Sequence, residues 1–414
     1  MRFVEQISIK GWIRIGVLNL LLVAVLGILM RLKFILPIPF LDLKHVQHAH
    51  SHFAFAGWVT HMLMLFLVLV TFRLQKKDNL PPHQNRILFS NLLCSLGMLF
   101  SFLYQGYGSL SISLSTGSIL VSYVFAIFTW RDIRQQNLDP KIARWFYLSL
   151  VFLVLSSFGT FYLAYLKVTQ QSNLKGHLSG LYFYLHFQYN GWFFFAIMGL
   201  VQHILNKQQA PLRETDKLFH ILSIATAPLY FLSILWTKPS TLVYLTIVIF
   251  AIGQLAIWIY WMIHLYAPTT RKKFACMDNY LKLIFSLLPF ALFFKFFLQT
   301  LSVIPALSAY VYGFRPVIIG YLHLVLLVIV SIFLISYAYL YGYFELSPRA
   351  KQFFTLFIIG VLLNELVLAL QGFLALFTAG LPQAHIYLLI ASTLIGIGLV
   401  GIIKASYNRL EKAT

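Results

Sequence analysis

The chain has 414 residues, of which 60% are hydrophobic and 10% charged, with a mean hydropathy of +0.82. A soluble domain carries about 25% charged residues, so this composition excludes a water-soluble fold and indicates an integral membrane protein. The formal charge of +20 would suit nucleic-acid binding in a soluble chain, but the basic residues lie in short segments between apolar runs, where they set membrane topology, and nucleic acid is excluded as a partner.

Apolar stretches of about 18 or more residues recur along the chain and predict twelve membrane-spanning helices. The first stretch, in MRFVEQISIKGWIRIGVLNLLLVAVLGILM, is too long for a cleaved signal peptide and lacks a small-residue cleavage site, so we expect it to remain as a helix. The expected fold is all-α, in a single membrane domain over 1–414. The predicted spans are 12–30, 47–72, 87–104, 109–130, 145–166, 179–203, 218–236, 241–264, 280–302, 316–342, 353–378 and 385–406.

Lys and Arg are about threefold more frequent on one side of these spans than on the other. The richer side faces the cytoplasm, which predicts that both termini are cytoplasmic and that the protein is a multi-pass protein of the bacterial inner membrane. In this topology the even-numbered spans enter the bilayer from the outside.

Four histidines crowd the outer end of span 2, in the string HVQHAHSHFAFAGWVTH that starts at His45. At 100° per residue His45, His48 and His52 share one helix face, whereas His50 points away and shares its face with His61. One face could chelate a metal and the other could ligate a haem. The plainer interpretation is a polar helix end in the headgroup region.

Two further histidines lie about 10–12 Å deep in spans that enter from the same side, His186 in span 6 and His323 in span 10. The intervals from His50 to His186 and from His186 to His323 are 136 and 137 residues, close to 138, a third of the chain. We therefore predict three pseudo-symmetric arcs of four helices, over about 1–138, 139–276 and 277–414. A chance match among the 13 histidines is the alternative.

Twelve spans in three arcs, with histidines on spans 2, 6 and 10, resemble the catalytic subunit (subunit I) of the haem–copper oxidase and nitric oxide reductase superfamily. The resemblance implies that a span-2 histidine and a span-10 histidine hold a low-spin haem. His50, in HAHSHFAFAGW, is the best match to the span-2 ligand, with His52 second and His48 third. His323, in YLHLVLL, is similar to the second member of the span-10 His-x-His pair.

The same resemblance implies an altered second site. Tyr321 replaces the histidine that would hold a second haem, His186 resembles the span-6 metal ligand, and Asn190 lies where nitric oxide reductases carry a glutamate. Span 7 lacks the adjacent histidine pair that completes the metal site, because its only histidine, His220, begins the span at the wrong depth. We therefore expect at most one bis-histidine haem, and an incomplete or remodelled centre in place of a second haem or copper. The HAH string also resembles a related twelve-span haem- and copper-containing protein implicated in nitric oxide resistance.

Charges within the bilayer cost about 2.5–3.5 kcal/mol each, which makes intramembrane Lys295 and Glu365 candidates for function. They could pair with each other, contact haem propionates or move protons, and Lys295 could instead extend towards the outer interface. Gln254 of span 8 is expected to bond between helices.

The first functional hypothesis is a haem-binding membrane protein, with His50 or His52 and His323 as ligands, acting in electron transfer or in the binding or reduction of O2 or NO. A cytochrome or a quinol would donate the electrons. If the protein is an enzyme, it is expected to be an oxidoreductase, with Tyr321, Asn190 and Glu365 as catalytic candidates.

The alternative hypothesis is a copper or zinc transporter or metal-handling protein. It would use His45, His48 and His52 to capture the ion, and His45, His48 and His186 are the candidate metal ligands. A third hypothesis is an assembly or structural subunit without chemistry of its own.

Overall fold

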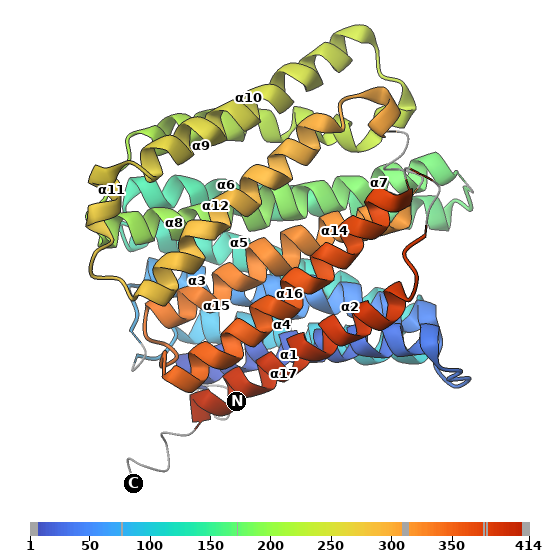
Figure 1. Cartoon of the computed structure of the whole chain (residues 1–414), viewed down its shortest axis with the longest axis horizontal. Helices are drawn as coiled ribbons and strands as arrows, with labels where there is room; N and C mark the ends of the chain where they lie inside the picture. The colour runs from blue at the N-terminus through green and yellow to red at the C-terminus, as the bar shows by residue number, and fades with distance from the viewer. Residues whose placement is uncertain are drawn as a thin grey trace. The chain divides into compact units, whose positions relative to one another are not determined.

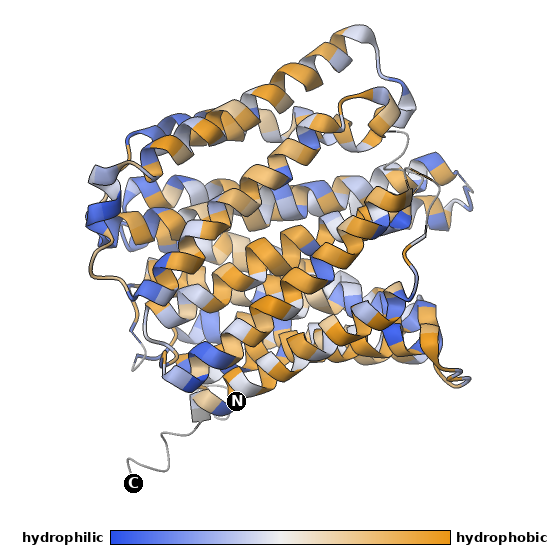
Figure 2. Ribbon diagram, in the orientation of Figure 1, coloured by the Kyte–Doolittle hydropathy of each residue, from blue (hydrophilic) through white to orange (hydrophobic). Residues whose placement is uncertain are grey.

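The computed structural model describes residues 7–75, 78–171, 173–308, 314–375, 377 and 380–407, and all the regular elements in these ranges are helices (Figure 1). Hydrophobic residues cover the long helices, and hydrophilic residues concentrate at the helix ends and loops (Figure 2). The expected all-α, multi-pass membrane fold is confirmed. Both chain ends, 1–6 and 408–414, and the end of predicted span 353–378 lie outside the described residues.

Eleven helical runs of the described chain are long and apolar enough to cross a membrane, and each overlaps a predicted span. Five are single helices between residues 9 and 265, α1 (Ile9–Ile35), α4 (Pro82–Gln105), α5 (Ser109–Gln135), α6 (Pro140–Val168) and α10 (Thr241–Leu265). Three lie further on, α12 (Asn279–Leu301), α16 (Pro348–Ala375) and α17 (Ala384–Tyr407). Three are composite: α2 (Leu43–Phe53) with η2 (Ala54–Thr60) and α3 (His61–Thr71), α9 (Glu214–Thr226) with η4 (Pro228–Thr237), and α14 (Arg315–His323) with η5 (Leu324–Ser331) and α15 (Ile332–Leu340).

The remaining predicted span, 179–203, is not among the eleven. It falls in a continuous helical run formed by α7 (Leu174–His186), η3 (Phe187–Phe193) and α8 (Phe194–Lys207). The run is long enough to cross a bilayer at 1.5 Å per residue, but His186, Gln188 and Asn190 make its middle polar. Twelve spans therefore remain a prediction.

The chain divides into two compact units, one formed by Met1–Phe128 and Leu322–Thr414 and the other by Thr129–Tyr321. In unit 1, α17 packs against both α16 and α1, and α2 packs against α4 and α1. The composite span Leu43–Thr71 is the most buried of the eleven, with 94% of its apolar window inside the protein. In unit 2, α6 packs against α7, η3 and α8, while α10 packs against α9 and α12. The proposed boundaries of the three sequence repeats remain a prediction.

Spans 2, 6 and 10 share a backbone feature that the others lack within the described residues. Each is interrupted by a π-helical segment: η2, η3 and η5 have seven, seven and eight residues. η3 and η5 begin directly after His186 and His323, and η2 begins four residues after His50. Such wide turns inside α-helices are frequent at functional sites. The three spans that carry the candidate histidines therefore share one local distortion.

Two asparagines from neighbouring helices stabilise η2. A change from α to π hydrogen bonding leaves carbonyl groups without a helical partner, and within a bilayer such groups must be satisfied by the protein. Asn19 Nδ2 of α1 donates to the carbonyl of Gly57 at 2.6 Å, and Asn91 Nδ2 of α4 donates to that of Ala56 at 3.2 Å. In addition, Trp58 Nε1 donates to Ser331 Oγ at 2.8 Å, which joins η2 to η5. Hydrogen bonds to α1, α4 and η5 thus hold the widened turn in place.

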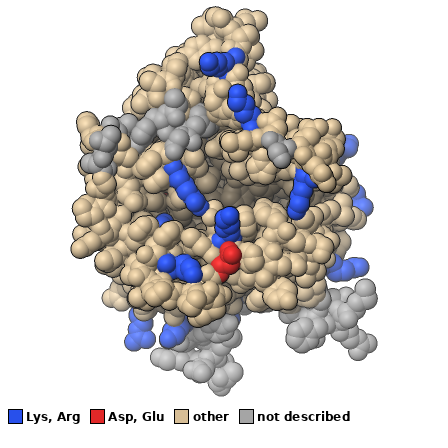
Figure 3. Space-filling view, turned by 90° about the vertical axis from the view of Figure 1, so that its right-hand side faces the viewer, with Lys and Arg blue, Asp and Glu red and all other residues tan. Residues whose placement is uncertain are grey.

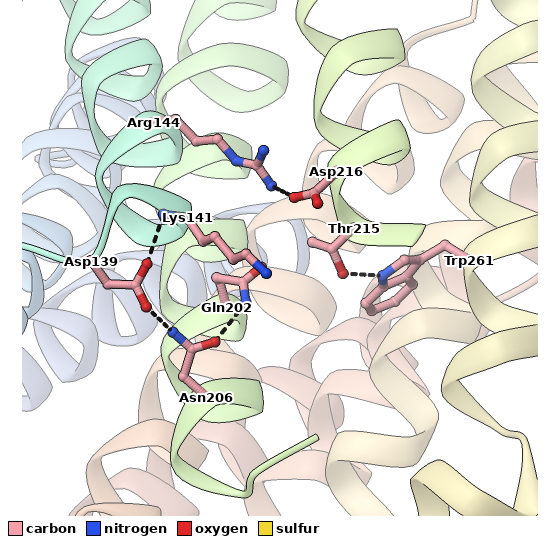
Figure 4. A network of polar contacts seen from close by, with 8 residues as sticks. All are labelled: Asp139, Lys141, Arg144, Gln202, Asn206, Thr215, Asp216 and Trp261. Carbon is pink, nitrogen blue, oxygen red and sulfur yellow. Dashed lines mark hydrogen bonds and ion pairs between the residues drawn. The ribbon is translucent and has the colours of Figure 1, made fainter. Parts of the chain in front are cut away.

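A polar network at one end of unit 2 joins α6, α8, α9 and α10 (Figure 4). Asp139 caps α6 by accepting from the Lys141 amide at 2.8 Å, and its second oxygen accepts from Asn206 at 2.7 Å. Arg144 and Asp216 form an ion pair between α6 and α9. The remaining bonds of the network run from Gln202 to Asn206 and from Trp261 to Thr215. These contacts fix the helix ends of unit 2.

On the face shown in Figure 3, basic side chains outnumber acidic ones. This agrees with the formal charge of +20 for the whole chain.

Replacing Asn19 or Asn91 by Ala should destabilise unit 1 by about 0.6–1.7 kcal/mol each, the range for hydrogen bonds between membrane helices, because a buried carbonyl of η2 loses its donor. The thermal unfolding midpoint of the purified protein in detergent measures the effect. Thr116→Ala is the control, since its exposed hydroxyl bonds only to Ile112 within α5. Equal midpoints for all three variants would contradict this role of the asparagines.

Candidate functional site

The helix that carries the outer histidines begins at a capped turn. Asp42 Oδ1 accepts hydrogen bonds from the backbone amides of Lys44 at 2.8 Å and His45 at 3.0 Å, which satisfies two of the free donors at the start of α2. The bond from the His45 amide, with that from Lys44, holds the pKa of the Asp42 carboxyl below its usual range. The cap fixes where α2 starts and therefore which way each histidine points.

His48 and His52 point towards the end of α4. His52 lies with its ring stacked on Phe102 at a centroid distance of 4.3 Å, and its Nε2 is 2.9 Å from the hydroxyl of Tyr107. His48 meets the ring of Tyr107 edge-on at 4.5 Å. Both imidazoles are thus held by aromatic contacts and, for His52, by a phenol.

His45 lies on the same side of α2, against the turn that follows α4. A Cβ atom built on Gly106 would fall 2.6 Å from Cδ2 of His45, and Gly106 has a φ of +61°, a conformation that favours glycine. The three histidines share a helix face, as their spacing indicates. Among the described residues, however, no group of three His, Cys, Asp or Glu side chains is arranged to hold a metal ion.

His50 faces the opposite way, towards α1. Its Nδ1 lies 3.0 Å from the backbone carbonyl of Val23. Because a carbonyl can only accept, Nδ1 carries the proton and Nε2 keeps its lone pair. In metal sites, a backbone carbonyl that accepts from one ring nitrogen in this way orients the imidazole so that its other nitrogen can bind the metal.

His323, at the end of α14, lies close enough to His50 for a charge on one imidazole to affect the other. The two residues are 273 positions apart in the sequence, and both belong to unit 1. The span-2 and span-10 histidines that the resemblance implies as haem ligands thus lie near each other in unit 1. Their role as ligands, and the choice of His50 over His52 and His48, remain predictions.

A fifth histidine of span 2 was not among the predicted ligands. His61 starts α3 with 0% of its surface exposed, and its ring lies 5.6 Å from that of Trp12. Trp12 is itself bonded to Asn85 through its Nε1 at 2.8 Å. The sequence indicated only that His61 lies on a face with His50.

In unit 2, His186 uses both ring nitrogens within the protein. Nε2 lies 2.7 Å from the carbonyl of Thr226, and Nδ1 lies 3.1 Å from Nδ2 of Asn190. The side chain is buried, with 1% of its surface exposed. The predicted ligand His186 is therefore already fully hydrogen-bonded.

Lys295 of α12 is the residue that orients this network. Its ammonium donates to Oδ1 of Asn190 at 2.6 Å and to Oε1 of Gln299 at 3.2 Å, and it lies 4.4 Å from the ring centre of Phe296. Gln254 donates to the same Gln299 oxygen at 3.1 Å, which is the bond between helices expected for Gln254. Only 2% of Lys295 is exposed, so its side chain does not extend towards the interface.

Tyr321 and Glu365 have fewer contacts. The ring of Tyr321 meets that of Tyr189 edge-on at 5.9 Å, and its hydroxyl is buried without a hydrogen-bond partner in the described part of the chain. In unit 1, Oε1 of Glu365 accepts from its neighbour Asn364 at 3.2 Å. Lys295 and Glu365 belong to different units, so the predicted pairing of the two gains no support.

No family model and no curated protein matches this chain. A functional assignment must therefore come from the arrangement of its own side chains. In the described residues, unit 1 offers His50, whose Nε2 is unprotonated, with His323 nearby, and unit 2 offers a polar network around Lys295.

Asn190→Leu should cost about 3–5 kcal/mol, the range for a buried charge that loses its partner, because the ammonium of Lys295 would keep only Gln299. The thermal midpoint in detergent would fall sharply. Gln188→Leu, in the same π segment, removes a neutral bond to Ser156 and should cost about 1 kcal/mol. Lys295→Met added to Asn190→Leu should recover part of the loss, and a purely additive double variant would show that the two side chains are not coupled.

Proposed function

We propose that the chain is a haem-binding protein of the bacterial inner membrane, with both termini in the cytoplasm, that transfers electrons. The observation that carries the proposal is the bond from Nδ1 of His50 to the Val23 carbonyl, which leaves Nε2 of His50 unprotonated, with His323 nearby in the same unit. These residues would fit the group, since a bis-histidine haem needs two imidazoles, each with one nitrogen free of a proton.

A low-spin haem with two imidazole ligands supplies a one-electron redox centre. The protein would contribute the orientation of His50 through the Val23 carbonyl and an apolar wall from α1, α2 and α4. That wall includes Val23, Leu26, Val46 and Ala49, all buried. Exclusion of water at such a site favours electron exchange over side reactions.

Electron transfer is the better supported of the two haem functions. With both His50 and His323 holding it, the haem would supply electron transfer and would not bind O2 or NO. Reduction of a gas would need a second centre, and His186, the candidate for it, has no free ring nitrogen. A cytochrome or a quinol is the proposed electron donor.

Absorption spectra of the oxidised and reduced protein, purified in detergent after expression with added haem, test the proposal. Wild type should show the Soret and α bands of a bis-histidine haem, and His50→Ala and His323→Ala should each lose at least tenfold in bound haem, the effect of removing a metal ligand or its support. His52→Ala is the matched control, because it lies two residues away on α2 and should retain haem.

Two results would contradict this function. One is colourless wild-type protein that carries stoichiometric copper or zinc, which would favour metal handling by His45, His48 and His52. The other is a reversed pattern in which His52→Ala loses haem and His50→Ala keeps it.

A further inference from the structure

We infer that the ammonium of Lys295 takes the place of a metal ion in unit 2, so that the site around His186 is a metal-free cationic centre. The inference deepens the proposed function, since it assigns the second site of the same protein. It stands on the contacts of His186, Asn190 and Lys295, all of which belong to unit 2.

The amide of Asn190 can have only one orientation. An ammonium has donors and no acceptor, so the atom of Asn190 that faces Lys295 at 2.6 Å must be Oδ1. The NH2 group then faces His186 and donates to its Nδ1 at 3.1 Å. Nδ1 is therefore unprotonated, and its lone pair is in use.

The other nitrogen of His186 is fixed by the backbone of α9. With Nδ1 as acceptor, Nε2 carries the proton and donates to the Thr226 carbonyl at 2.7 Å. That carbonyl is available because the helix tightens into η4 at Pro228, where the amide of Tyr230 bonds to Ala227 instead of Thr226. Neither nitrogen of His186 can ligate a metal without breaking one of these bonds.

The positive charge of Lys295 also disfavours a metal ion at His186. The ammonium of Lys295 is joined to His186 by a single amide, and a divalent ion at His186 would face this cation in an environment of low dielectric constant. In the described residues the partners of Lys295 are two amide oxygens and the face of Phe296, and none of them is a carboxylate. The positive charge of the lysine is solvated by dipoles, as a bound metal ion would be.

A gain-of-site experiment tests the inference. Wild type, His186→Ala, Asn190→His and the double variant Asn190→His with Lys295→His are loaded with Zn2+ or Cu2+, passed through a desalting column and analysed for metal. The double variant can supply three imidazoles and should retain about one ion per chain, whereas Asn190→His alone, which keeps the ammonium, should retain at least tenfold less. Wild type and His186→Ala should retain equal amounts.

Asn190→His with Lys282→Met is the matched control. It removes a positive charge from the same helix, at a lysine that bonds to the Ala275 carbonyl and to Asn279 near the start of α12, and should retain no more metal than Asn190→His. A single gel-filtration peak shows that each variant is folded, and haem absorbance, recorded on the same samples, reports on the haem proposal separately.

Retention of about one non-haem ion by wild type, lost in His186→Ala, would overturn the inference, as the site would then be a metal site. So would a folded double variant that binds no metal, or Asn190→His binding as much as the double variant. If the double variant does not fold, the amounts of metal retained by wild type and by His186→Ala are sufficient to test the inference. Loss of haem from all variants would count against the proposed function and leave the metal result to be judged by itself.

Discussion

Polar groups inside a bilayer must find their partners within the protein, because the hydrocarbon offers none. In this chain three π segments add to the groups that need such partners, because they leave backbone carbonyls in the middle of helices without a helical hydrogen bond. At η2 the side chains of Asn19 and Asn91 donate to two of these carbonyls, and each comes from a helix that packs against this span. Side-chain amides therefore join α1 and α4 to span 2, and the arrangement of these two helices around the span depends on them.

The need for partners within the protein also distinguishes the histidines from one another. Both ring nitrogens of His186 are hydrogen-bonded, one to Asn190 and one to Thr226, so the residue has no free lone pair. Nε2 of His52 is hydrogen-bonded to the hydroxyl of Tyr107. In His50, Nδ1 is bonded to the Val23 carbonyl, and Nε2 retains its lone pair. An imidazole that is held in place and still has a lone pair is suited to bind iron, and this separates residues that look alike in the sequence.

The sequence predicted the membrane spans well, since eleven stretches are apolar enough to be identified by composition alone. It predicted the orientation of His50 because α2 is a regular helix up to Phe53, so angles of 100° per residue apply there. It could not settle whether Lys295 is buried, since its partner Asn190 is 105 residues away and contributes only an amide. It gave no sign of η5, whose residues are nearly all aliphatic and carry no pattern that distinguishes a wide turn from an ordinary one. The haem itself remains a prediction.

The π segments also change how the two halves of a span relate to each other. A π turn holds more residues than an α turn, so the side chains that follow it are rotated about the helix axis relative to those that precede it. The N-terminal half of predicted span 6, in α7, contacts α6 and η4, while the C-terminal half, in α8, contacts α6 and carries Gln202 and its bond to Asn206. One helix can in this way serve two sets of neighbours. A single-residue deletion in such a segment would rotate one half against the other, so the length of each span is under a constraint that its hydrophobicity alone does not impose.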